Sequence, residues 1–324
     1  MVPPWPTTTG SLFSGSEDIQ AGLKATYEMS LKYVGPDTQG RSPQNYLSHV
    51  GLEGDFGKLK LGQQWRPMFT AIAATDPTQL SATPGFAGAG KGGTGLSGLA
   101  SEPNSDTITY NLPSFTPGLF IQLQHGFANT TQGENSGGHI IFTDGKKFFV
   151  TYAIHNEKML KGSYFAASLT GTNGVDKTVA GAVLMGSGGT GLPHVLYSST
   201  NGGDNRESSG LAGTYDFGFV KLVAGHVTEK VNGTSAKLDM DVLGAKVPFG
   251  ERVNLGYLHS IATHTRATTS PKFTLSGDKL LLTYDLSKRT TVYYAYGKQQ
   301  LDGGTTAGNE FSTTMEAIGL RHTF

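Results

Sequence analysis

The residue types that most often carry catalysis or metal binding are present, but their spacing does not assemble a site. Residues 85–91 match the G-x-x-x-x-G-K spacing of a phosphate-binding loop, yet Gly92 stands where a Ser or Thr is required. The nine histidines show no metal-ligand spacing, and the absence of cysteine excludes thiolate chemistry, disulfides and cysteine metal sites. No Gly-x-Ser-x-Gly motif occurs. We therefore expect no enzyme, no metal and no cofactor.

Charged side chains in regular positions favour a different kind of chemistry, that of fixed charges. Such charges select ions and orient polar solutes when they line a narrow aqueous passage. Some of them alternate with apolar residues in short segments, and others lie in or beside a long Gly- and Ala-rich segment, residues 66–105. The candidates are Lys24, Glu28, Lys60, Arg66, Asp76, Lys91 and Glu102.

The segments that would position these charges read as β-strands. Residues 22–29 and 237–243 alternate strictly between apolar and polar side chains, as the two faces of a strand require. Leu238, Met240 and Val242 share one face of the second segment, and we expect this series to face hydrocarbon. We find no amphipathic helix of any length.

The composition excludes several classes of protein. Lys+Arg and Asp+Glu number 25 each, so no net charge attracts nucleic acid. Charged residues make up only 15% of the 324 residues, and Gly accounts for 46. No run approaches the ~18 apolar residues of a membrane helix. A transmembrane barrel with a polar lumen fits these values, and so does a Gly-rich soluble β-protein.

The connections between strands are alternately short and long, which is typical of outer-membrane barrels. At roughly twenty residues per strand and half-connections, the chain predicts an all-β, transmembrane antiparallel β-barrel of about sixteen strands. The candidate strands number about seventeen, and single-chain bacterial barrels have even counts, so eighteen stays an alternative.

The end of the chain supports closure of a ring. Phe324, His322, Leu320 and Ile318 share one face of the final segment, opposite small or polar residues. An aromatic at the terminus would sit at a membrane interface, so we expect Phe324 to mark barrel closure. A terminal strand of a soluble sandwich is the alternative reading of this segment alone.

Four stretches, in order along the chain, carry a resemblance. They are Gly15–Asp18 with Gly22–Ala25, Val50–Gly57 with Leu59–Gly62, Tyr284–Thr290, and Gly319–Phe324. With these stretches the chain resembles the trimeric general porins of proteobacterial outer membranes. The resemblance implies a water-filled barrel, most often a trimer, whose third extracellular loop folds into the lumen and narrows it.

In this chain the corresponding loop is residues 66–105, within a single domain of residues 1–324. We expect Lys24, Lys60 and Arg66 to face Asp76 and Glu102 across the constriction. A transverse field of this kind would orient polar solutes. For any one of these residues the alternative is a solvated charge without effect on permeation.

The chain also departs from the family pattern. We find no first strand within residues 1–9. Gln63 and Ser14 stand where the family has basic residues, which weakens the expected basic wall. Residues 163–185 look like a hairpin that the family lacks.

These observations predict an outer-membrane porin for passive diffusion of ions and small hydrophilic solutes. A substrate-selective channel, a soluble β-rich binding or adhesion protein, and a barrel hydrolase are the alternatives, the last because triads are recognised by geometry. Expected partners are a homotrimer, outer-membrane lipid and lipopolysaccharide, and permeating solutes, but no nucleic acid. The expected location is the Gram-negative outer membrane. Residues 1–6 lack the basic and apolar regions of a signal peptide, so export would require a signal that has been removed.

Overall fold

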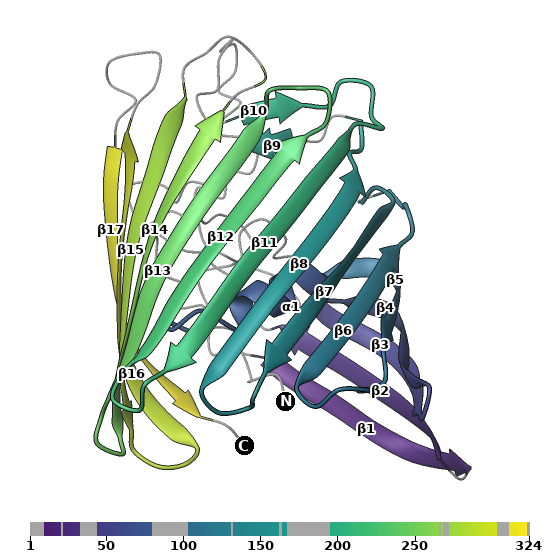
Figure 1. Ribbon diagram of the computed structural model, residues 1–324, viewed down its shortest axis with the longest axis horizontal. Helices are drawn as coiled ribbons and strands as arrows, with labels where there is room; N and C mark the ends of the chain where they lie inside the picture. The colour runs from purple at the N-terminus through teal and green to yellow at the C-terminus, as the bar shows by residue number, and fades with distance from the viewer. Residues whose placement is uncertain are drawn as a thin grey trace.

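Strands make up almost all of the ordered structure (Figure 1). The computed structural model describes residues 10–20, 22–32, 44–79, 103–130, 132–161, 164–166, 195–265, 267, 272–302 and 311–322. The strands are β1 (Gly10–Gln20), β2 (Leu23–Lys32), β3 (Gln44–Gly54), β4 (Gly57–Gln64), β5 (Asn104–Asn111), β6 (Leu119–Gly126), β7 (Asn135–Thr143), β8 (Phe148–Lys158), β9 (Tyr164–Ala166), β10 (Val195–Ser198), β11 (Asn205–Asp216), β12 (Lys221–Val231), β13 (Lys237–Phe249), β14 (Val253–Thr265), β15 (Phe273–Asp285), β16 (Thr290–Asp302) and β17 (Phe311–His322). One helix, α1, spans Pro67–Ala73.

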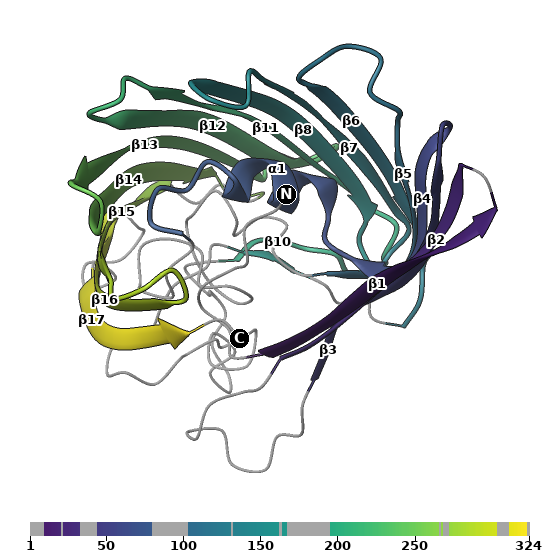
Figure 2. The ribbon, with the colours of Figure 1, turned by 90° about the horizontal axis from the view of Figure 1, so that it is seen from below.

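Fifteen of these strands form one antiparallel sheet in which each strand pairs with its neighbours along the chain. The sheet curves around a central space (Figure 2), which confirms the expected all-β barrel architecture. Strand β8 pairs directly with β11, so β9 and β10 form a separate two-stranded ribbon. Of the extra hairpin expected at residues 163–185, only β9 is described; it pairs with β10 outside the main sheet, and residues 167–185 lie outside the described residues.

The ladder order begins at β1 and ends at β17, and the described residues include no pairing between these two strands. Phe324, the residue expected at the closure, lies outside the described residues. The faces predicted for the last strand are confirmed, because Ile318 and Leu320 are 80% and 62% exposed while Arg321 points to the concave side, where it binds Gln79.

Short turns join the strands at one end of the barrel. In the turn between β7 and β8, the Asp144 carboxylate accepts hydrogen bonds from the backbone N–H groups of Lys146, Lys147 and Phe148. These bonds favour the charged form and lower the pKa of Asp144. Aspartate at this position thus closes the turn with its own side chain.

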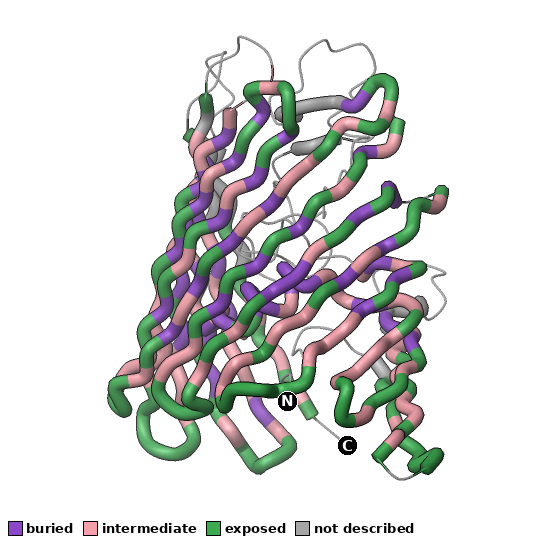
Figure 3. Tube along the Cα trace, turned by 45° about the vertical axis from the view of Figure 1, so that its right-hand side comes forward, coloured by how far each residue is buried: buried purple, intermediate pink, exposed green. Residues whose placement is uncertain are grey.

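Exposed and buried residues alternate along the strands (Figure 3). Many outward positions carry exposed large apolar side chains, which we call the apolar band. At the end of the barrel away from the short turns, outward side chains change from apolar to polar. Across the ladder, apolar residues face polar ones at this boundary, in the pairs Ile154–Ser209, Leu243–His259 and Tyr296–Glu316. The strands of a barrel are tilted, whereas a bilayer surface is flat. The change from apolar to polar side chains therefore does not fall on directly paired residues of neighbouring strands.

The expectation for Leu238, Met240 and Val242 is wrong. These side chains are buried on the concave face, where they belong to one apolar cluster with α1. The outward positions of this part of β13 are Lys237, Asp239 and others, which lie above the apolar band. Alternation separates two faces, but it does not say which face meets lipid when the other face packs against protein.

The helix α1 belongs to a segment, Trp65–Gln79, that we call the strap. It crosses the concave face beneath β6, β7, β8 and β11 (Figure 2). Met68, Ala71 and Ile72 are each at most 1% exposed and pack on Val227, Leu258 and other wall residues. A helix here contradicts the sequence-based expectation of none. Seven residues are too few for a periodic pattern, and Pro67 at the first turn is the one signal that could have indicated it.

Beyond α1 the strap continues across β13 and β14 because two glycines leave room for it. A Cβ on Gly256 would lie 2.2 Å from the Pro77 carbonyl oxygen, and one on Gly244 would lie 3.0 Å from the Pro77 ring. At its end, the Gln79 side-chain oxygen accepts a 3.0 Å hydrogen bond from Arg321 of β17.

The packing of α1 predicts a stability difference between two isoleucines. Ile72→Ala removes a fully buried side chain and leaves a cavity, so it should destabilise the fold by about 2–5 kcal/mol. Ile154→Ala removes a side chain from the exposed outer wall, where no cavity forms, and should cost clearly less. Urea unfolding of both variants in the same lipid or detergent measures the difference. Equal losses would contradict the packing of α1.

Candidate functional site

A neutral polar network fixes the start of the strap. The Gln124 side-chain amide donates to the Trp65 carbonyl and to Thr109 Oγ1, both at 3.0 Å. Asn104 Nδ2 donates to the oxygens of Gln124 and Asn135, at 3.2 and 2.6 Å. Trp65 in turn stacks on Phe69 of α1, with ring centroids 4.2 Å apart. The first turn of the strap is thus held on β5, β6 and β7 without charge.

A charged cluster lies beside this network, formed by one strap residue and four wall residues. We call it the clasp; it consists of Arg66, His155, Glu157, Arg206 and Glu229. Arg66 Nη1 lies 3.1 Å from Glu157 Oε2 and 2.9 Å from His155 Nε2. Arg206 of β11 forms an ion pair with Glu229 of β12, whose side chain is fully buried. With a neutral histidine the two arginines and two glutamates balance.

Asp76 anchors the far part of the strap. Its carboxylate accepts hydrogen bonds from the backbone N–H and the hydroxyl of Thr78, at 2.7 and 2.6 Å. It is also the charge that acts on Lys279, a fully buried residue on the concave face of β15. The strap therefore meets compensating charge at both ends.

The concave faces of β2, β3 and β4 carry a second group of charges. Lys24 lies 3.8 Å from Asp18 and pairs across the ladder with Glu53. The register places Lys60 on the same face, where it is partly buried and lies near the charges of Lys58, Glu28 and Glu53. These side chains remain partly exposed: the Lys24 and Glu53 side chains are 54% and 49% accessible. Water therefore reaches this wall.

The concave face carries every described residue that the sequence nominated. Lys24, Glu28 and Lys60 lie on the wall, and Arg66 and Asp76 lie on the strap. Arg66, however, forms an ion pair with Glu157 of the wall, and the charge of Asp76 acts on Lys279. The expectation that Arg66 faces Asp76 across the constriction is therefore wrong. Lys91 and Glu102 lie outside the described residues.

Sequence reasoning missed the wall residues of the clasp. Arg206 falls in a stretch that reads as a Gly-rich loop, but β11 begins at Asn205. Glu229 alternates in step with Val227 and Val231, so its position on a buried face was readable from the sequence. An acidic residue on an apolar face requires a partner, and Arg206 supplies it.

The described residues contain no group of three or more metal-ligating side chains suited to a metal ion. Their helices also include none that is long and apolar enough to cross a membrane. The arrangement supplies fixed charges on a water-accessible wall.

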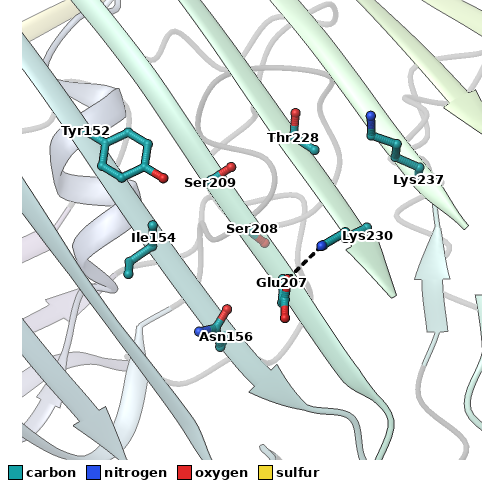
Figure 4. Close-up of a pocket in the computed structure, with 9 residues that line it drawn as sticks. All are labelled: Tyr152, Ile154, Asn156, Glu207, Ser208, Ser209, Thr228, Lys230 and Lys237. Carbon is teal, nitrogen blue, oxygen red and sulfur yellow. Dashed lines mark ion pairs between the residues drawn. The ribbon is translucent and has the colours of Figure 1, made fainter. Parts of the chain in front are cut away.

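The outer wall carries a shallow hollow of about 520 Å³ at the upper edge of the apolar band (Figure 4). Tyr152 and Ile154 line its apolar side, and polar side chains such as Asn156 and Glu207 line the other side. Lys230 Nζ lies 3.0 Å from Glu207 Oε2, and Lys237 Nζ lies 2.9 Å from an oxygen of Asp239. Ser209 of β11 also lines the hollow, and its side chain is smaller than those of Tyr152 and Lys230 on the neighbouring strands.

Solved structures of outer-membrane proteins share this fold. The chain is 18% identical to the anion-selective porin from Comamonas acidovorans, with a TM-score of 0.68 over 99% of this chain and 91% of that one. It is 13% identical to the outer-membrane protein OmpT of Vibrio cholerae, with a TM-score of 0.67 over 98% and 89% of the two chains. A trimer form of OmpT is 14% identical, with a TM-score of 0.62 over 98% and 91%.

No curated protein matches the sequence. A family model for Gram-negative porins matches residues 7–304. The curved antiparallel sheet, its outer apolar band and its charged, water-accessible inner wall are what a passive channel in an outer membrane needs. The chain belongs to the Gram-negative porin family and forms an outer-membrane channel for the passive diffusion of small solutes.

Proposed function

We propose that solutes pass between the strap and the wall formed by β1 to β5, and that this protein is a channel without enzymatic activity. The observation that carries the proposal is the difference in burial between the two sides. Val227, Leu258 and Leu275 on the strap side are completely buried, whereas Lys24 and Glu53 on the other side keep about half of their side-chain surface accessible. A polar solute would follow the hydrated side, because the apolar side offers it no hydrogen bonds.

In this proposal residues 66–105 form the constriction loop, and its described part already narrows the space from one side. Lys24, Glu28 and Lys60 face the passage from the other side and set its field. Arg66 and Asp76 act chiefly on the position of the loop, because their charges are compensated within the wall. Lys91 and Glu102 complete the proposed constriction set.

A charge reversal tests this assignment. Lys60→Glu would place a third carboxylate beside Glu28 and Glu53, so the permeability of K⁺ relative to Cl⁻ should rise by about two-fold or more. The reversal potential in a planar bilayer under a KCl gradient measures this ratio. Lys288→Glu, in an exposed turn, is the matched control and should leave the ratio unchanged. The assignment fails if Lys60→Glu behaves like the control.

We also propose that the protein is a homotrimer. Support comes from the shared fold, since OmpT of Vibrio cholerae has a trimer form. Large apolar side chains such as Phe13, Tyr27 and Val50 stand exposed on the outward faces of β1 to β3, where either lipid or a second subunit can cover them.

Light scattering of the detergent-solubilised protein tests the assembly. We expect a protein mass three times that of one chain, after subtraction of the detergent. A monomer mass under conditions in which the channel conducts would contradict the proposal.

Outer-membrane lipid and lipopolysaccharide are the proposed partners of the outer wall. The hollow of Figure 4 is suited to an amphiphile, because apolar side chains line its membrane side and two ammonium groups stand at the level of lipid headgroups. A phosphate on the headgroup would compete with Glu207 for Lys230.

Lipid binding predicts a charge-dependent stabilisation. Adding lipopolysaccharide to the detergent-solubilised protein should raise its Tm, and the double variant Lys230→Glu/Lys237→Glu should lose most of that rise. Lys288→Glu/Arg289→Glu, on a turn at the opposite end of the barrel, is the control. Identical shifts in both double variants would rule out the hollow as the binding place.

A further inference from the structure

The clasp holds the root of the strap, residues 65–67, on the wall. Some of its groups can take up a proton in acid and others cannot. Arg66 reaches the wall from the strap, while His155 and Glu157 come from β8, Arg206 from β11 and Glu229 from β12. All five lie on the concave face, and none of their side chains is more than 21% accessible where an ion pair records it. Water therefore screens their charges only weakly.

The contact with Arg66 fixes the chemical form of His155. A guanidinium group only donates hydrogen bonds, so the His155 Nε2 atom, 2.9 Å from Arg66 Nη1, must accept. The imidazole is then neutral, with its proton on Nδ1. Among the described residues Nδ1 has no hydrogen-bond partner, and the backbone of Gly137 lies directly beside it. Protonation would turn the accepting nitrogen into a donor that points at a cation.

Acid changes the charge of the clasp in one direction only. His155, Glu157 and Glu229 can each take up a proton, whereas Arg66 and Arg206 stay charged under all ordinary conditions. Whichever group is protonated first, the balanced cluster becomes positive, and the order need not be known. His139 of β7 also faces the strap root, where its Nδ1 lies 3.0 Å from the Pro67 carbonyl oxygen, and its protonation would add a further positive charge nearby.

We propose that the clasp is an acid-sensitive latch that keeps the strap root on the wall near neutral pH and releases it in acid. Release follows because Arg66 loses both its acceptors, Nε2 of His155 and the charge of Glu157, and is repelled by the positive cluster that remains. The apolar face of α1 keeps the rest of the strap inside the barrel, while the hydrogen bond from Gln124 to the Trp65 carbonyl loosens together with the root once Arg66 is repelled. The expected consequence for permeation, a narrower passage, rests on the proposed role of the strap in the constriction.

Trp65 offers a direct reporter of release. The chain has two tryptophans, and Trp5→Phe leaves Trp65 alone, stacked on Phe69 one residue from Arg66. In the full-length protein in detergent, lowering the pH from about 7.5 to about 4.5 should shift the Trp65 emission maximum to longer wavelength. Far-UV circular dichroism over the same range should show the sheet intact. Single-channel conductance in a planar bilayer is recorded in parallel.

Two clasp variants move the transition in opposite directions. Glu229→Gln removes the ion-pair partner of Arg206 and makes the clasp positive already at neutral pH, so it should shift the midpoint toward neutral pH by at least about one unit. His155→Gln keeps an acceptor for Arg66 but removes a titrating group, so its midpoint should move to lower pH. Glu207→Gln and His226→Gln lie on β11 and β12 but face outward, and should leave the midpoint where it is.

A Trp65 emission maximum that stays constant across this pH range would overturn the proposal, as would clasp variants that shift no more than the two outward controls. If Glu229→Gln does not fold, His155→Gln alone decides between these outcomes. A wild-type Trp65 shift without a change in conductance would uphold the latch and count against the strap as the constriction.

Discussion

The contact between α1 and the concave wall is the interaction on which the interior of this barrel depends. A curved sheet of fifteen strands encloses more space than wall side chains can fill, so the interior is either water or additional chain. Ile72 and Met68 bring apolar surface into that space, and they form one buried cluster with Leu238, Met240 and Leu258 of the wall. This contact removes one side of the lumen from water and leaves the other side hydrated. The charged side chains of β2 to β4 lie on the hydrated side.

Two kinds of charge follow from the same arrangement. Charges under the strap, such as Glu229 and Lys279, are buried and answered by a neighbour of opposite sign, because an isolated ion would be too costly away from water. Charges on the open side, such as Lys24, are partly accessible and keep a field in the water beside them. Burial thus divides the ionic groups into those that are paired within the protein and those that water reaches.

The sequence predicted the strands, the Gram-negative porin family and the concave position of Lys24, Glu28 and Lys60, because strict alternation survives in any strand. It also predicted the outward face of Ile318 and Leu320. It failed at Leu238, Met240 and Val242, whose apolar face meets α1 and not lipid. That error has a physical origin: lipid and protein interiors select the same side chains, and only the position of the strap distinguishes them. The partner of Arg66 could not be predicted either, since Glu157 lies far from it in the sequence and the two meet only when the strap folds inward.

The two glycines under Pro77 make the position of the strap depend on distant residues of the wall. With only 2.2 Å between the Pro77 carbonyl oxygen and the place of a Cβ on Gly256, even one methyl group would act as a wedge between wall and strap. A side chain at residue 256 therefore requires the strap backbone near residue 77 to move away from the wall. Gly256 has no charged side chain, so a substitution there would shift the strap by steric means and leave the charges of the wall as they are.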